Sequence, residues 1–129
     1  MRLLMYYDGR EHTRKAVQIL KTRAKIMKSK VHLVSCIHSW GEPSLRILTD
    51  MRNDLHVVRD VLDKENIPCQ THVCIKWRNP GDYILDVAYR YNVDEIIIGT
   101  NKESKIAKYR HGWFITHVLD WAQCPVLLV

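Results

Sequence analysis

A cluster of basic side chains is the part of the sequence best suited to binding an anion. Four cations follow Gly99, with Glu103 as the one acidic residue among them: Lys102, Lys105, Lys108 and Arg110. A lysine ammonium binds phosphate as a point charge, without the fixed geometry of a glycine-rich loop. This segment is a candidate site for a small anion, although a solvated surface loop is the interpretation we favour.

Two pairs of cysteine and histidine have the residue types of a zinc site without its spacing. Cys36 and His38 form one pair and His72 and Cys74 the other, each separated by one residue on a predicted strand. Zinc ligands usually come in pairs with wider spacing. We therefore interpret these residues as core thiols and strand-edge histidines, and we expect no metal. The four cysteines lack CxxC spacing, which favours reduced thiols in a cytoplasmic protein.

No pattern in the sequence predicts catalysis. The nucleophile elbow G-x-S-x-G, the Walker motif and H-E-x-x-H are all missing from the chain. His111 and His117 lie near the basic cluster, but neither is paired in sequence with a clear nucleophile. We assign no catalytic residue and expect a protein that is not an enzyme.

The bulk composition describes an ordinary globular chain. It has 129 residues, 47% hydrophobic and 26% charged, with a formal net charge of +6. That length predicts one domain over residues 1–129. No apolar run is long enough to span a membrane, and residues 1–9 lack the pattern of a signal peptide. We expect a cytoplasmic protein.

The first predicted helix is strongly basic, which raises the question of nucleic acid. Its cations include Arg10, Arg14, Lys15, Lys21 and Arg23. A basic stripe is the electrostatic footprint of a protein that binds a phosphate backbone. No aromatic residues alternate with these charges to stack on bases, and no recognised nucleic-acid module is present. A solvated outer face is the favoured interpretation, and nucleic acid is an unlikely partner.

The elements that position these residues alternate between strand and helix. Short apolar runs predict strands at Leu3–Tyr7, Val31–Ile37, Gln70–Lys76, Glu95–Gly99 and Pro125–Val129. Helical spacing of apolar residues fills the four intervals, with helices near 13–27, 43–65 and 112–122 and a third that opens at Pro80-Gly81-Asp82. This alternation predicts an open parallel sheet with helices on both faces, a Rossmann-like α/β fold. Such sheets bind ligands at the carboxyl ends of their strands, here the loops after Tyr7, Ile37 and Ile98.

Several local segments, in order, give the chain a resemblance to the universal stress protein family. The segments are Tyr7-Asp8-Gly9, Pro80-Gly81-Asp82, the run from Asp94 to Thr100, and the ending from Ala122 to Val129. The resemblance covers essentially the whole chain. It implies a five-stranded sheet in the order 3-2-1-4-5, of the adenine nucleotide α hydrolase-like type. It also implies a homodimer and a role in stress-linked signalling or binding, with ATP bound by only some members.

The glycine motif of the ATP-binding members is altered here. Those members carry G-x2-G-x9-G-(S/T) after the fourth strand, and the matching positions are Gly99, Lys102, Gly112 and Trp113. A lysine in place of the middle glycine costs about 1 kcal/mol if a left-handed backbone is still required. Trp113 replaces a hydroxyl that would face phosphate. The altered motif predicts that ATP binding of the family type is weakened or lost. Two expectations for the cofactor stay open, none or ATP.

Other parts of the family's nucleotide site are retained. By resemblance, Asp8 would lie near a ribose and base, Cys36 near adenine, and Ile98 and Gly99 at the strand-four contacts. Asp8 also fits a turn residue that bonds to its own backbone, and the sequence leaves both roles open. Tyr6 and Tyr7 either stack on a base or block one.

The last strand predicts how the protein associates. Val126–Val129 is apolar and would form an outer strand in the implied order. Pairing with a second copy satisfies its free backbone groups and gives a two-fold interface. We expect a non-catalytic, dimeric stress-response or regulatory protein that binds a protein partner or a small anion. The alternative is a nucleotide-dependent regulator that binds ATP.

Overall fold

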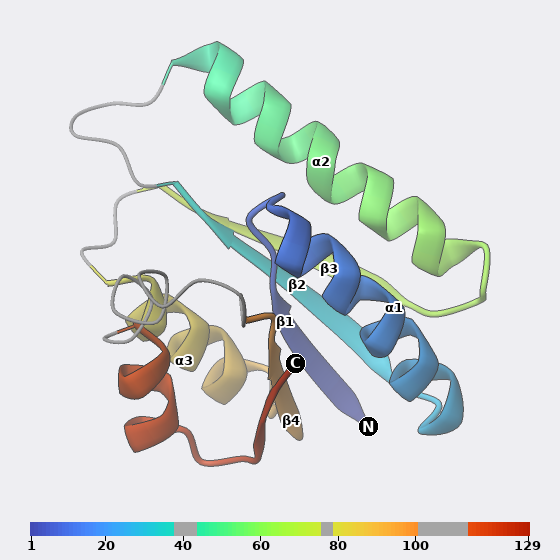
Figure 1. The fold of residues 1–129 in the computed structure, drawn as a ribbon, viewed down its shortest axis with the longest axis vertical. Coiled ribbons are helices and arrows are strands. Elements are labelled where there is room, and N and C mark those ends of the chain that lie inside the picture. The colour runs from blue at the N-terminus through green and yellow to red at the C-terminus, as the bar shows by residue number, and fades with distance from the viewer. Residues whose placement is uncertain (38–43, 76–78, 101–113) are drawn as a thin grey trace.

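The computed structural model describes residues 1–37, 44–75, 79–100 and 114–129 (Figure 1). Its strands are β1 (Arg2–Tyr6), β2 (Lys30–Cys36), β3 (Cys69–Cys74), β4 (Glu95–Ile98) and β5 (Val126–Leu128). Its helices are α1 (Glu11–Ile26), α2 (Leu45–Asp63) and α3 (Pro80–Arg90), and residues 114–121 are helical as well. The strands are parallel and lie in the order β3-β2-β1-β4-β5, which confirms the predicted fold.

Each face of the sheet is covered by its own pair of helices. Successive side chains of a strand point to opposite faces, so Leu3 and Met5 pack with α1 and α2 whereas Leu4 and Tyr6 pack with α3 and the last helix. Figure 1 shows the two pairs of helices on either side of the strands. The two apolar clusters meet only through the sheet, which gives three layers.

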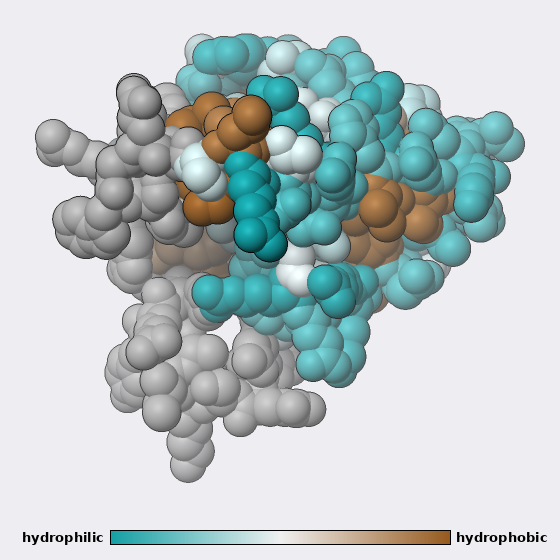
Figure 2. Space-filling model, turned by 90° about the horizontal axis from the view of Figure 1, so that it is seen from above, coloured by the Kyte–Doolittle hydropathy of each residue, from teal (hydrophilic) through white to brown (hydrophobic). Residues whose placement is uncertain are grey.

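The central strands are buried on both faces, as expected for a sheet that carries helices on both sides. Leu3, Leu4 and Met5 of β1 are fully buried, as are Ile96 and Ile97 of β4. Burying each such side chain contributes about 1.5–3 kcal/mol. Continuous apolar runs are typical of parallel strands that helices cover on both sides. The surface seen from above in Figure 2 is mainly hydrophilic, with apolar area confined to small separate patches.

Side-chain caps fix where two helices begin. Ser44 accepts a hydrogen bond from the Ile47 amide at the start of α2, and Asn79 accepts one from the Gly81 amide at the start of α3. Asp82 lies in the first turn of α3, where a negative charge is favourable. The first helix begins at Glu11, two residues earlier than predicted. Within the described residues, no helix is long and apolar enough to cross a membrane.

The turns that follow α1, α2 and α3 share one backbone device. Lys28, Asn66 and Asn92 adopt left-handed conformations with φ of 47°, 58° and 51°. A left-handed residue just after a helix reverses the chain tightly. All three turns lie at the amino ends of the strands, where they lead directly into β2, β3 and β4.

Candidate functional site

Asp8 lies just beyond β1 and orders the turn into α1. Its Oδ1 accepts hydrogen bonds from the Arg10 amide and from the Thr13 hydroxyl, both at 2.9 Å. The Arg10 Nε lies 3.8 Å from the other carboxylate oxygen. Gly9, with φ of 79°, provides the left-handed step between them. One of the two roles left open by the sequence, the turn residue, is therefore present in the fold.

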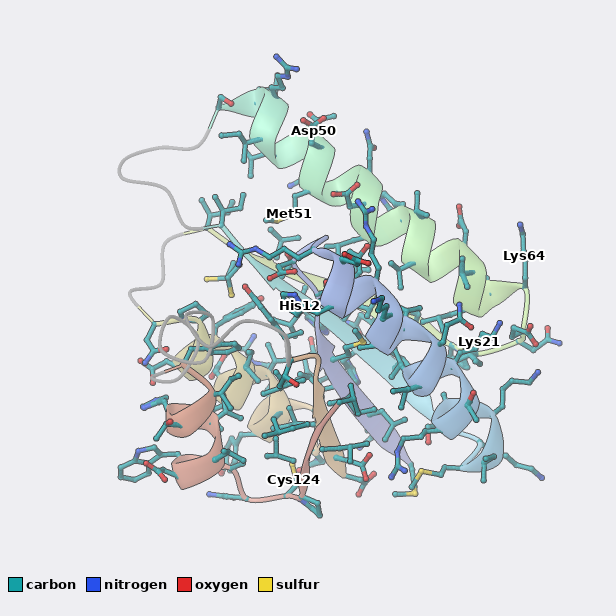
Figure 3. All side chains as sticks on the ribbon, viewed as in Figure 1. His12, Lys21, Asp50, Met51, Lys64 and Cys124 are labelled. Atoms are coloured by element: carbon teal, nitrogen blue, oxygen red, sulfur yellow. The ribbon has the colours of Figure 1, made fainter. Side chains whose placement is uncertain are left out.

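Gly99 lies at the end of β4 and lets α1 approach the sheet. A Cβ built on Gly99 would stand 2.9 Å from the His12 carbonyl oxygen and 3.1 Å from the Ala16 Cβ. Figure 3 shows His12 at the N-terminal end of α1, where this helix meets the strand ends. Close packing of backbone against backbone thus requires glycine here, whether or not a ligand is bound.

Thr100, the next residue, is bonded to the end of the chain. Its amide donates to the Val129 carbonyl oxygen at 2.6 Å, and its hydroxyl donates to the same oxygen at 3.0 Å. The Val129 amide donates in turn to the Ile98 oxygen at 3.0 Å. The backbone amide that follows Gly99 is therefore already hydrogen-bonded within the protein. No pattern in the sequence predicts this contact.

Tyr6 and Tyr7 both pack inside the protein, on opposite faces of the sheet. The Tyr6 ring lies 5.0 Å from that of Phe114, and Tyr7 packs in the cluster beneath α1 and α2. Burial raises the pKa of the Tyr6 phenol, and the nearby Cys36 and Asp8 raise it further. Both tyrosines are buried, so neither presents an open ring face to solvent.

Cys36 ends β2 beside a second thiol. It is in register with Cys74 of β3, both side chains are buried, and the two thiols form a hydrogen bond. Burial raises the pKa of Cys36, and Cys74 raises it further. A buried protonated thiol packs like a small apolar side chain. This agrees with the interpretation of the two residues as core thiols.

The structure thus brings part of the predicted site together. Asp8, Cys36, Ile98 and Gly99 lie at the carboxyl ends of three neighbouring strands, β2, β1 and β4. The remaining candidates fall outside the described residues: Lys102, Lys105, Lys108, Arg110, Gly112 and Trp113. His38 also lies outside them. Among the residues that are described, no group of three or more metal-binding side chains could hold an ion.

His72, one of the histidines considered above for a metal site, pairs instead with His32, which no sequence pattern indicated. His32 Nδ1 is 3.0 Å from His72 Nε2, and both rings lie against Tyr91, with centroids 4.7 and 5.0 Å away. His32 is buried, and its Nε2 has no hydrogen-bond partner in the described part of the chain. Burial lowers the pKa of His32 to about 4, with smaller contributions from His72, Lys30 and Arg2.

A groove of about 860 Å³ lies between α3 and the last helix. Asp82 and His117 join the two helices at one end of it, with 2.5 Å between Oδ1 and Nε2. A cavity of similar size, about 880 Å³, lies at the amino ends of the strands among Arg2, Lys25 and Lys28. Neither was predicted, because a groove between elements depends on how they pack.

Comparison with known proteins gives one consistent result. The model of the universal stress protein family matches residues 1–129. A relative in Thermus aquaticus, the universal stress protein in the QAH/OAS sulfhydrylase 3′ region, is 26% identical over 133 residues, covering 98% of this chain and 96% of that one.

Solved structures show the same fold. A universal stress protein from Archaeoglobus fulgidus has a TM-score of 0.82 at 20% identity, covering 99% of this chain and 97% of its own. The universal stress protein from Archaeoglobus fulgidus in complex with dAMP has a TM-score of 0.78 at 19% identity, covering 99% and 96%.

Proposed function

This chain belongs to the universal stress protein family, and we propose that it is a non-catalytic regulatory protein of the stress response that acts by binding a protein partner. In this proposal, nucleotide binding of the family type is weakened or lost. Its four cysteines are free. Free thiols suit a reducing compartment, and we propose that the protein acts in the cytoplasm.

The bond between Thr100 and Val129 is the observation that carries the proposal. A phosphate site at the end of a strand depends on backbone amides that are free to point at the anion. The Thr100 amide already donates at 2.6 Å to the Val129 oxygen, and the Thr100 hydroxyl donates to the same atom. Binding a phosphate through this amide would require breaking that contact first.

The carboxylate at the other side of the site supports the same view. Asp8 Oδ1 holds the Arg10 amide and the Thr13 hydroxyl, so a ribose would have to share or displace them. Lys102 and Trp113 occupy positions at which the ATP-binding members carry a glycine and a hydroxyl residue. Each departure weakens a different part of a nucleotide site.

We propose that the protein acts as a homodimer through β5. Pro125 and Val129 use their backbone groups to bond β4. The alternation of a strand then directs the N–H and C=O groups of Val126 and Leu128 away from the sheet. An apolar edge strand of this kind is covered when it pairs with its own copy about a two-fold axis.

A nucleotide-dependent regulator is the second candidate. It is favoured by the likeness to a universal stress protein solved with dAMP and by the convergence of Asp8, Cys36 and Ile98 at neighbouring strand ends. In that case ATP, or a nucleotide with fewer phosphates, is the ligand. A small anion held by Lys102, Lys105, Lys108 and Arg110 is compatible with either candidate.

Calorimetric titration of the nucleotide-free protein separates the two candidates. We expect no saturable heat with magnesium-ATP, AMP or dAMP up to about 1 mM, which corresponds to a binding free energy weaker than about −4 kcal/mol. Micromolar binding that disappears in Asp8→Ala would reverse the order of the candidates. Asp8→Asn is the matched variant, because it keeps an oxygen for the Arg10 amide and the Thr13 hydroxyl while removing the charge. Inorganic triphosphate, titrated separately, tests the basic cluster without a base or ribose.

A further inference from the structure

The groove between α3 and the last helix, called here the α3 groove, has apolar walls. Leu85, Ala88 and Tyr89 line it from α3, Trp121 and Ala122 line it from the other side, and Ile96 of β4 lies at its floor. Figure 1 shows the two helices side by side on the sheet face opposite α1 and α2. With a volume of about 860 Å³, the groove is large enough for several side chains of a bound segment.

Two large aromatic residues in this groove are mostly exposed. Tyr89 is 75% exposed and Trp121 is 69% exposed. Tyrosine and tryptophan each bury about 150–250 Å² when covered, and they are the residue types most enriched among binding hot spots. They face one groove from two different helices, so a single bound segment can contact both.

The described residues that line the α3 groove include two carboxylates and no lysine or arginine. The chain has a formal net charge of +6, yet Asp82 and Asp86 line the groove. Asp86 is paired with Arg90 at 2.9 Å, and Asp82 with His117.

Cys124 also lines the groove, and burial is the main cause of its raised pKa. The two aspartates, with no lysine or arginine among the described lining residues, favour a cationic occupant.

We propose that the α3 groove binds a basic and apolar peptide segment of a partner protein. Tyr89 and Trp121 hold its hydrophobic side chains, while Asp82 and Asp86 face its lysines or arginines. The inference rests on the proposed function, because it names the surface and the class of partner through which a non-catalytic regulator acts. A second copy of this chain would need a second interface to fill the groove, because the proposed homodimer uses β5.

Two designed peptides of matched length test the inference on the full chain. One is a fluorescein-labelled amphipathic helix of leucine and lysine, and the other has glutamate at each lysine position. The net charge of +6 attracts the glutamate peptide non-specifically and repels the lysine peptide. Preference for the lysine peptide, measured by fluorescence anisotropy, therefore reports a local acidic groove. We expect micromolar binding of the lysine peptide and weakening when salt is raised.

Variants then locate the binding surface. Trp121→Ala and Asp86→Lys each weaken binding of the lysine peptide about tenfold or more, because one removes a hot-spot ring and the other reverses a charge. Leu45→Ala and Asp60→Lys are the matched controls. Both lie exposed on α2, which covers the other face of the sheet, and both leave the affinity unchanged.

Three results would overturn the inference. They are equal affinity of the wild type, Trp121→Ala and Asp86→Lys, tighter binding of the glutamate peptide, and a loss of dimers in Trp121→Ala by sedimentation equilibrium. The last would show that the groove is filled by a second copy. Tight nucleotide binding with unchanged peptide binding would instead refute the proposed function and leave the α3 groove as a peptide site.

Discussion

The two faces of the sheet bury different kinds of side chain. The face beneath α1 and α2 is filled mainly with aliphatic side chains, with Met5 and Tyr7 among them. Its buried carboxylate, Glu95, is held by two bonds from Arg23, at 2.8 and 2.7 Å. The face beneath α3 and the last helix contains the histidine pair, the thiol pair and Tyr6, and it opens into the α3 groove.

This difference assigns separate roles to the two layers. Aliphatic packing with its buried carboxylate paired provides stability and tolerates little change. Neutral histidines and thiols, by contrast, are kept uncharged by burial and respond to pH or to substitution. We infer that the α1–α2 layer maintains the fold, whereas the α3 layer is the one that varies with function. Four experiments test this contrast, beginning with the largest expected effect.

Truncating one buried side chain on each face compares the two cores directly. We expect Leu20→Ala, on α1, to lower the free energy of unfolding by about 4 kcal/mol and Ile84→Ala, on α3, by about 2–3 kcal/mol. Both side chains are fully buried, but the α3 layer borders an open groove and can relax around the gap. Urea denaturation measures both, with the more exposed Ile19→Ala as control. A larger loss for Ile84→Ala would reverse the contrast.

Two glycines allow a similar comparison for close packing. A Cβ at Gly99 would meet the His12 carbonyl oxygen at 2.9 Å, and a Cβ at Gly81 would meet side-chain atoms of Asn79 and His117 at 3.0 Å. Backbone atoms cannot move aside as side chains can. We expect Gly99→Ala to cost about 2–3 kcal/mol and Gly81→Ala about 1 kcal/mol, measured by thermal unfolding. Equal costs would mean that α1 shifts as easily as the last helix.

The histidine pair makes the α3 layer sensitive to acid. The pKa of His32 is about 4 in the folded protein, below the ordinary 6.5, so the unfolded chain takes up the proton first as the pH falls. Stability from this residue is complete above pH 6.5 and is lost between pH 6.5 and 4, by on the order of 2 kcal/mol. Burial lowers the pKa of His72 as well, which adds to the loss with the same sign.

Unfolding free energies at pH 7 and pH 4.5 check this for the wild type and His32→Leu. The carboxylates titrate in both proteins, so the difference between them isolates the histidine. We expect a shallower pH dependence in His32→Leu. Identical profiles would show that the buried ring does not titrate in this range.

The smallest effect is expected at the thiol pair. Cys36→Ala removes one buried heavy atom and should cost about 1 kcal/mol, as for other small apolar truncations. Cys69→Ala on the other face is the matched variant. A loss well above that of Cys69→Ala would mean that the contact between Cys36 and Cys74 stabilises the fold beyond packing.

Much of the fold could be predicted because its signals are local. The apolar runs of β1 and β4, the turn at Asp8-Gly9 and the start at Pro80-Gly81 each depend on a few adjacent residues. The carboxyl-end position of Asp8, Cys36 and Gly99 followed from the topology alone. The strand order came from the family resemblance, and the structure confirms it.

The features that were missed depend on register between distant segments. His32 meets His72 because β2 and β3 pair with Val34 opposite His72, and no local pattern fixes that alignment. The bond between Thr100 and Val129 likewise requires β5 to end beside β4. The roles assigned to Lys102, Gly112 and Trp113 stay predictions, because these residues lie outside the described part of the chain.

The left-handed residues Lys28, Asn66 and Asn92 have a consequence for how this fold can change. They hold three chain reversals to a few residues at the amino ends of the strands, so an insertion there would separate a helix from the strand it feeds. The candidate site residues Asp8, Cys36 and Gly99 lie at the opposite, carboxyl ends of the strands. An insertion at the amino ends would therefore disturb the layers that support the site, so we expect changes of specificity to arise in loops at the carboxyl ends instead.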